Sequence, residues 1–374
     1  MDPVTHTLTG TSLAAVGLRR ATPLATATLV LAANAPDVDV VAHLFGTPTA
    51  LAWRRGITHG IPALILLPFL VTGAIVLWDR HIRLRRMPEA QPVRTRAVLF
   101  LAFLGVWTHP ALDWLNTYGM RWLMPFDNRW TYGDAVFIID PWLWLLVGGA
   151  SFVVFSRTLW ARIAWAVLAA AGSALVLASV IPLPAKVLWV LGLAILVLIR
   201  ARIGPRKRHR QRRAAVARFC GAGAAVYIAA MVALAQAAER DVRNRLAQES
   251  IVGVGDVMVS PAPANPLAGV AVAEVSDMYM RGTFRWNRSP RFRPDLPGVF
   301  IGDLEPLVEA VQEDPDARNF LKWSRFPFYQ VEEVEAGFRV RVGDARYPDD
   351  PGTGGLRGVT VYLDPELRLL DPPG

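Results

Sequence analysis

Long apolar segments recur through the first two thirds of this 374-residue chain, and they constrain its fold more than any other feature. Segments of nearly 20 apolar residues have the length that a helix needs to cross a lipid bilayer. Charged residues make up only 19% of the sequence, less than in an ordinary soluble domain. The sequence therefore predicts a polytopic membrane protein. The apolar segments run over approximately 7–18, 22–36, 57–78, 97–118, 135–155, 160–181, 185–201 and 214–237.

These segments predict a mainly helical fold, a membrane bundle of about 6–8 membrane segments. The first two are short for complete spans, and we expect them to form a tilted or re-entrant hairpin. We predict a membrane domain over residues 1–237 and a small, soluble α+β domain over residues 238–374. The single cysteine, Cys220, excludes both a disulfide framework and a cysteine-based zinc site within one chain.

Charge is distributed unevenly between these two parts. Residues 1–236 contain 24 Lys and Arg against 9 Asp and Glu, a net charge of +15, whereas the remainder has a net charge of −6. The basic loops 79–96 and 200–213 are expected to stay in the cytoplasm by the positive-inside rule. The last span then ends outside, and so the C-terminal domain is predicted to be extracytoplasmic. Topology explains the basic residues, so we expect no nucleic-acid partner.

A signal peptide is the competing interpretation of the N-terminus. The stretch LRRATPLATATLVLAANAP has paired arginines, an apolar run and small residues before Pro36. Cleavage there would remove His6. The aromatic residue expected after twin arginines is missing and several spans follow, so we favour retention of the segment.

The C-terminal domain has the pattern of a small α+β fold. A charged helix is expected over approximately 237–249, and a second helical stretch near 303–323. Between and after them, stretches such as IVGVGDVMVS and GFRVRVGDARY alternate apolar and polar residues as strands do. No catalytic motif occurs in this part, and we expect it to have a structural or substrate-gating role.

Acidic residues are rare in the membrane part, and six of the nine in residues 1–236 fall toward the outer side under this topology. Ionisable residues near a membrane core are costly and are usually functional. Four histidines are expected on the same side, whereas His81 and His209 belong to the basic loops. The six acidic residues are Asp37, Asp39, Asp113, Asp127, Asp134 and Asp140, and the four histidines are His6, His43, His59 and His109.

His109 and Asp113, in THPALDWLNTYG, form the most specific local pattern. Positions i and i+4 of a helix project to one face, where an imidazole and a carboxylate can share one metal ion. These ligand types together suit Zn²⁺, Mn²⁺ or Fe²⁺. The alternative is a buried structural pair in which the histidine hydrogen-bonds the aspartate.

The stretch NAPDVDVVAHLFG adds Asp37 and Asp39 after a predicted helix end. Two carboxylates at i and i+2 can chelate a cation, although aspartates are also common in turns and helix caps. The stronger argument is convergence, since one topology brings to one side of the membrane six residues from four separate segments. These residues are His6, Asp37, Asp39, His59, His109 and Asp113.

The order of these motifs, THTLTG, APDVDV, RRGITHG and THPALDWLNTYG, resembles the YdjM-like family of bacterial inner-membrane proteins, which are described as predicted metal-dependent hydrolases. The resemblance covers about residues 1–145 by motif. It implies a location in the bacterial inner membrane and matches the family pattern at His6, Asp37, Asp39, His59 and the pair His109 and Asp113. Many members have a histidine directly after P-D-x-D, where this chain has Val40.

A fainter similarity connects the same order to zinc-dependent phospholipase C, which implies a multi-metal phosphoesterase centre. That pattern continues with further histidine ligands, yet this chain has no histidine between residues 110 and 208. One or two metal ions are therefore expected, with zinc first and manganese or iron as alternatives.

Together these observations predict a membrane-bound metal hydrolase acting on a phosphoester or lipid-like substrate at the outer membrane surface. Asp39 is the candidate general base, because it need not bind metal once Asp37 does. Arginines near the site could hold a phosphate or could anchor the chain at the interface. Asp127 and Asp140 are candidate acceptors for the second ring N–H of a metal-binding histidine. The predicted metal ligands are His6, Asp37, His59, His109 and Asp113, and the predicted phosphate-binding residues are Arg54, Arg55 and Arg121.

A non-enzymatic function is the alternative. The same residues could form a structural metal site or a cation pathway, because intramembrane ionisable residues serve such pathways too. The inverted repeat of many transporters is not evident in the sequence, which favours an enzyme.

Overall fold

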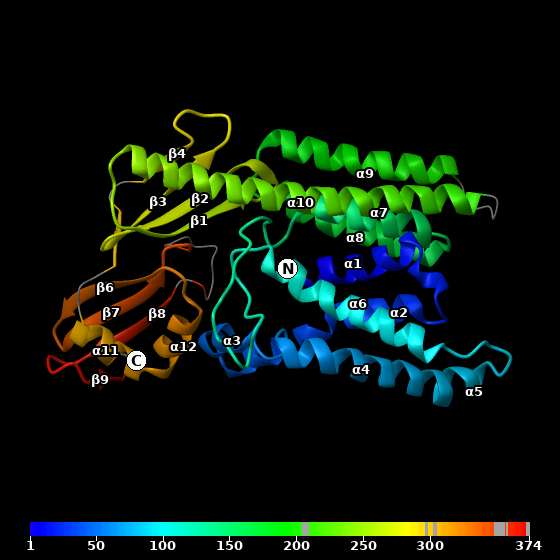
Figure 1. Cartoon of the computed structure of the whole chain (residues 1–374), viewed down its shortest axis with the longest axis horizontal. Coiled ribbons are helices and arrows are strands. Elements are labelled where there is room, and N and C mark those ends of the chain that lie inside the picture. The colour runs from blue at the N-terminus through cyan, green and yellow to red at the C-terminus, as the bar shows by residue number, and fades with distance from the viewer. Residues whose placement is uncertain (204–208, 296–297, 302–304, 348–355, 357, 372–374) are drawn as a thin grey trace. The chain divides into compact units, whose positions relative to one another are not determined.

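The structure, a computed structural model, describes residues 1–203, 209–295, 298–301, 305–347, 356 and 358–371 (Figure 1). The chain divides into two compact units, which we describe separately. The first unit comprises residues 1–38, 55–235 and 261–266. The second comprises residues 39–54, 236–260 and 267–374.

Helices dominate the first unit, as expected. In the part of the chain that the structure describes, six helical segments are long and apolar enough to cross a membrane. This number confirms the predicted helical membrane bundle. The six segments are Ala25–Phe45, Ile61–Arg86, Thr95–Trp114, Leu159–Ala178, Leu183–Ile203 and Arg210–Gln248.

The N-terminal segments form a helical hairpin. Helix α1 (Pro3–Val16) ends at Gly17, whose φ of 154° lies in the region that favours glycine. A short turn leads to α2 (Ala25–Asn34), which continues as the 3-10 helix η2 (Ala35–Phe45). A Cβ at Gly10 of α1 would lie 2.8 Å from the Leu29 carbonyl oxygen, so only glycine permits this close approach to α2.

Helix α6 (Thr95–Trp114) packs against α2, and α4 (Ile61–Trp78) packs against both (Figure 1). A Cβ at Gly105 of α6 would lie 2.6 Å from the Ala32 Cβ. Gly10 and Gly105 are each one turn away from a predicted metal ligand, His6 and His109. The close helix crossings therefore bring the two histidine-bearing faces together.

Helix α7 (Pro141–Phe155) is shorter than the predicted segment 135–155, because Asp140 caps it and Pro141 occupies its first turn. It packs against α1 and, with its Leu143 and Val147, against the long α10 (Arg210–Gln248). Helices α8 (Leu159–Ala178) and α9 (Leu183–Ile203) complete the first unit.

The second unit is a small α+β domain with two antiparallel sheets, as its alternating sequence predicts. The last turns of α10, with Val242 and Leu246, pack on the first sheet, and α12 (Pro315–Trp323) packs against α3 (Thr47–Trp53). Helix α10 runs through the boundary predicted between residues 237 and 238, and the two units divide at residue 236. The strands of the first sheet are β1 (Val254–Ala262), β2 (Asn265–Val275), β3 (Met278–Arg285), β4 (Phe292–Pro294) and β5 (Val299–Phe300). The strands of the second sheet are β6 (Pro327–Val334), β7 (Gly337–Asp344), β8 (Val359–Leu363) and β9 (Leu369–Leu370). The helices of this unit include α3 (Thr47–Trp53), α11 (Glu305–Glu313) and α12 (Pro315–Trp323).

Candidate metal centre

The pair His109 and Asp113 lies in the last turn and a half of α6, on the face that packs into the first unit. Both side chains are buried, with exposed fractions of 0% and 1%. The distance from His109 Nε2 to Asp113 Oδ2 is 3.6 Å. The two side chains thus point to one place, as the i, i+4 spacing predicts.

His6 reaches the same place from the first turn of α1. Its ring stacks on His109 with centroids 3.7 Å apart and planes 15° from parallel. Its Nε2 lies 3.2 Å from Asp113 Oδ1, whereas His109 faces the other carboxylate oxygen, Oδ2. The hairpin of α1 and α2 accounts for this approach.

Asp37 of η2 and His59, from the turn before α4, complete the cluster. Asp37 Oδ1 lies 3.7 Å from His109 Nε2, and His59 Nε2 lies 3.1 Å from that same nitrogen. Their potential ligand atoms form two groups of three that share His109, and within each group all atoms lie within 4.8 Å of one another. The structure therefore brings together all five predicted metal ligands.

The orientation of His109 leaves an unshared electron pair inside the cluster. Its Nδ1 lies 2.7 Å from the Ala33 carbonyl oxygen, which can only accept a hydrogen bond. The neutral imidazole therefore carries its proton on Nδ1, and its Nε2 faces His59 Nε2 and the oxygens of Asp37 and Asp113. Imidazole nitrogens and carboxylate oxygens that converge in this way are ligand types that a divalent metal such as zinc binds.

His59 has its own orienting partner, since Thr58 Oγ1 lies 2.9 Å from its Nδ1. Ligating histidines usually engage such a partner with their second nitrogen, which fixes the ring and the tautomer. Ala33 and Thr58 fill this position here, and neither was singled out from the sequence as such a partner.

Arg55 holds Asp113 from the side. Its Nε lies 2.8 Å from Asp113 Oδ2, and its Nη1 donates to Asn116 Oδ1 at 2.9 Å and to the Gly119 carbonyl at 3.2 Å. The guanidinium also stacks over the Tyr118 ring at 4.5 Å. Arg55 adopts a left-handed backbone conformation, with φ of 52°, which is uncommon for a residue other than glycine. These contacts make Arg55 a positioning residue for the cluster.

Two further groups near Asp113 were not assigned from the sequence. Asn116 accepts from Arg55 and from the Tyr118 backbone N–H, so it links the end of α6 to the following turn. The Met1 amino group contacts Asp113 Oδ1. The position of Asn116 one residue beyond the helix cap was the available signal, because asparagine commonly stabilises such turns.

The other predicted phosphate-binding residue of the first unit, Arg121, is 3% exposed. It donates to Asn128 Oδ1 at 2.9 Å and stacks over Trp130 at 4.5 Å. These contacts stabilise the loop between α6 and α7.

Asp127 and Asp140, which were predicted to accept from metal-binding histidines, have other partners. Asp127 pairs with Arg129 at 2.7 Å, and the hydrogen bond from the Arg129 backbone lowers the pKa of Asp127. Asp140 caps α7 and accepts from the Tyr227 hydroxyl at 2.8 Å. Among the described residues, neither carboxylate bonds one of the five predicted ligands, because both are held by their own local turns and caps.

Asp39 and Arg54 belong to the second unit. They form an ion pair in which Arg54 Nε lies 3.4 Å from Asp39 Oδ1, and Asp39 is largely buried. Their predicted roles as general base and phosphate-binding residue stay predictions.

Comparison with known proteins gives this arrangement a context. Residues 1–185 match the model of a family described as YdjM inner membrane protein. This match covers just under half of the chain, and over these residues the chain is similar to the YdjM inner membrane protein family. The resemblance expected from the motifs is thereby confirmed, and the family name refers to the inner membrane. All five residues of the cluster lie within the range that matches the YdjM family.

One curated relative is the uncharacterized protein YfhP of Bacillus subtilis (strain 168), 26% identical over 156 residues. The match spans 39% of this chain and 43% of that protein, less than half of its length. No solved structure matches the chain significantly. The comparisons do not show the fainter similarity to zinc-dependent phospholipase C.

Proposed function

We propose that the membrane half is a metal-dependent hydrolase that acts on a phosphoester or lipid-like substrate at the outer face of the inner membrane. The observation that carries the proposal is the convergence of three imidazoles and two carboxylates from four segments of the chain. This convergence involves the residues that the motif order had singled out. We designate these five side chains the His/Asp cluster: His6, Asp37, His59, His109 and Asp113.

The composition of the His/Asp cluster supports zinc as the metal, with manganese or iron as alternatives. Because the two groups of three atoms share His109, they fit one ion or two adjacent ions. A divalent ion supplies Lewis acidity and activates water at neutral pH.

The chain's own residues would orient the metal ligands and handle the proton. Ala33 and Thr58 orient the two imidazoles, and Arg55 keeps Asp113 in place. Asp39 is proposed as the general base, two residues beyond Asp37. Asp37 is 15% exposed, whereas the other members of the cluster are at most 1% exposed. The side of Asp37 is therefore the proposed entry for substrate and water.

The burial of the cluster also favours a second candidate function, a structural metal site or cation pathway. Four of its five side chains are almost completely enclosed, as in sites that bind metal only to stabilise a fold. The distinction rests on turnover, because both functions require bound metal.

The first experiment measures the metal content of the purified full chain by mass spectrometry of its elements. We expect His109→Ala and Asp113→Ala to lose the metal that the wild type retains, because the first removes the ligand that both groups share and the second removes a carboxylate ligand. His81→Ala is the matched control, an exposed histidine outside the cluster. Equal metal in folded samples of all four proteins would contradict the site.

The second experiment supplies metal-loaded protein with a panel of phosphoesters and phospholipids. Hydrolysis that disappears in His109→Ala and persists in His81→Ala supports the enzyme. Stoichiometric metal without turnover across the panel would favour the structural or cation-pathway alternative.

A further inference from the structure

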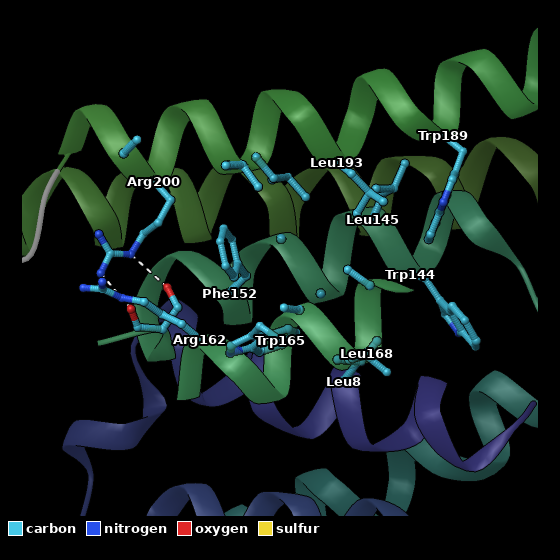
Figure 2. Close-up of a pocket in the computed structure, with 18 residues that line it drawn as sticks. Leu8, Trp144, Leu145, Phe152, Arg162, Trp165, Leu168, Trp189, Leu193 and Arg200 are labelled. Carbon is cyan, nitrogen blue, oxygen red and sulfur yellow. Dashed lines mark hydrogen bonds between the residues drawn. The ribbon is translucent and has the colours of Figure 1, made fainter. Parts of the chain in front are cut away.

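A second site lies between helices α7, α8 and α9 of the first unit. A cavity of about 580 Å³ opens there, within the range of about 300–1,000 Å³ that is typical of ligand pockets (Figure 2). Its wall is almost entirely apolar, and includes Trp165, Leu193 and, from α1, Leu8. No member of the His/Asp cluster lines it.

One end of this cavity is strongly basic. Figure 2 shows Arg162 of α8 and Arg200 of α9 together at that end, with the aromatic rings of Trp144 and Trp189 toward the other. Arg200 is only 7% exposed and donates twice to Ser156, to Oγ and to the carbonyl oxygen, each at 2.8 Å. Among the described residues, no acidic side chain forms an ion pair with Arg162 or Arg200.

Other arginines reinforce this positive charge. Burial lowers the pKa of Arg19, in the turn after α1, and the nearby charges of Arg157 and Arg213 lower it further. Arg157 and Arg162 also lie close enough to Arg200 to act on its charge. Like charges that lie close together repel, so an anion bound between Arg162 and Arg200 would lower the electrostatic free energy of this end of the cavity.

The length of the cavity matches one leaflet of a bilayer. Trp189 and Arg200 are eleven residues apart on α9, a rise of roughly 16 Å in an α-helix. Half the hydrocarbon thickness of a bilayer is about 15 Å. The positive-inside rule predicts that the arginine end faces the cytoplasm, where anionic lipids are recognised by basic pockets between helices.

We propose that this cavity binds an anionic phospholipid of the cytoplasmic leaflet. The phosphate lies between Arg162 and Arg200, and one acyl chain extends along the apolar wall toward Trp144 and Trp189. This lipid site goes beyond the proposed hydrolase and does not depend on the His/Asp cluster.

The test uses the full chain reconstituted into nanodiscs of phosphatidylglycerol and phosphatidylethanolamine in a ratio of about 3:7, and then released into mild detergent. Native mass spectrometry measures the lipid that the protein retains. We expect the wild type to retain phosphatidylglycerol in preference to phosphatidylethanolamine. Arg162→Gln should retain roughly fivefold less, as the loss of one charge contact near an anionic headgroup implies.

Two further variants separate the effect of charge at the cavity from that of surface charge and of cavity shape. Arg202→Gln removes the same charge two residues beyond Arg200, on a side chain that does not line the cavity, and should match the wild type. Ala169→Phe fills the cavity without changing charge and should also lose the lipid. Because Arg162 is exposed and has no described side-chain bond, its substitution should leave the thermal unfolding of the lipid-free protein unchanged.

The proposal would be overturned if Arg162→Gln and Ala169→Phe both retained as much phosphatidylglycerol as the wild type does. Equal loss in Arg202→Gln, which indicates general surface attraction, would overturn it too. Stabilisation of the detergent-solubilised protein by inorganic phosphate to the same degree as by phosphatidylglycerol would identify a simple anion site instead. A dimer cross-linked through cavity residues, with no retained lipid, would assign the face to a second copy of the chain.

Discussion

Two buried carboxylates, Asp113 in the membrane half and Asp344 in the C-terminal domain, have different kinds of neighbour. Asp344 is surrounded by donors, since it accepts from Ser324 Oγ at 2.7 Å, from the Arg325 backbone at 2.8 Å and from Arg346 at 2.8 Å. Asp113 also has cationic partners, but three imidazole rings and a second carboxylate converge beside it.

The difference separates a structural ion pair from a candidate ligand site. The Arg346 guanidinium is 1% exposed and stacks over the Trp323 ring at 4.4 Å, so charge and hydrogen-bonding capacity are balanced locally. In the His/Asp cluster the Nε2 atoms of His59 and His109 are 3.1 Å apart, and the second of these carries no proton in its neutral form. Burial alone therefore does not distinguish the two sites, whereas the convergence of several potential ligand atoms does.

The largest effect is expected from breaking the buried ion pair of Asp344 with Arg346. Asp344→Asn removes the charge of Asp344 from its buried ion pair with Arg346 and should destabilise the C-terminal domain by about 3–5 kcal/mol. Hydrogen exchange of strand β7 in the full chain measures this loss. Asp364→Asn, at the surface pair with Arg368, should leave exchange in β7 unchanged. Metal content should not change in either variant, and a loss of metal in Asp344→Asn would erase the distinction between the two sites.

The next effect concerns Thr58, the hydrogen-bond partner of the predicted metal ligand His59. Thr58→Val removes the hydroxyl beside His59 Nδ1 and should weaken metal binding about 10–100-fold, as is typical of such partners. Competition with a metal chelator gives the affinity. Thr72→Val is the matched control, because its hydroxyl donates to the carbonyl of Pro68 within its own helix, α4. Unchanged affinity in Thr58→Val would show that this hydroxyl does not orient a ligand.

A smaller effect tests the helix crossing behind the cluster. Gly105→Ala places a methyl group 2.6 Å from the Ala32 Cβ and should cost about 1–3 kcal/mol, with weaker metal binding as α6 shifts. Gly73→Ala points into open space in α4 and should be neutral or stabilise by up to about 1 kcal/mol. Thermal unfolding and chelator competition of both variants provide the measurement. Equal behaviour of the two would exclude the crossing as a determinant of the cluster.

The smallest effect is the dependence on pH in the C-terminal domain. Burial by itself raises the pKa of Asp344, but the charge and hydrogen bonds of Arg346, with that of Ser324, outweigh it and leave the pKa below its ordinary value. Stability from this pair is therefore complete above the unfolded pKa of about 3.9 and declines as the pH falls through the lower folded value.

We accordingly expect the stability difference between the wild type and Asp344→Asn to shrink below about pH 4, because protonation makes the aspartate resemble the asparagine. Hydrogen exchange of β7 at several pH values, corrected for the intrinsic rates, follows this change. A difference that grows toward acid pH would mean that the carboxylate is not held in its charged form.

Much of the fold could be predicted from local patterns. Apolar length predicted the membrane helices, and alternation predicted β1 and β7, because both patterns depend only on which face of an element meets lipid, core or water. The predicted segment 135–155 was too long, since apolar character does not reveal that a chain begins its helix only at Asp140 and Pro141.

For the candidate site, the sequence by itself determined the shared face of His109 and Asp113, because a spacing of four residues fixes it on any helix. It also singled out His6, Asp37 and His59 through the order of their motifs. Only the tertiary structure decided the partners of these groups, namely the Ala33 carbonyl behind His109, Arg55 beside Asp113, and the Tyr227 hydroxyl that donates to Asp140. It alone placed Arg162 and Arg200 at one end of an apolar cavity. Helical periodicity is set by neighbours along the chain, whereas the choice of a hydrogen-bond or ion partner depends on segments that packing brings together from far apart.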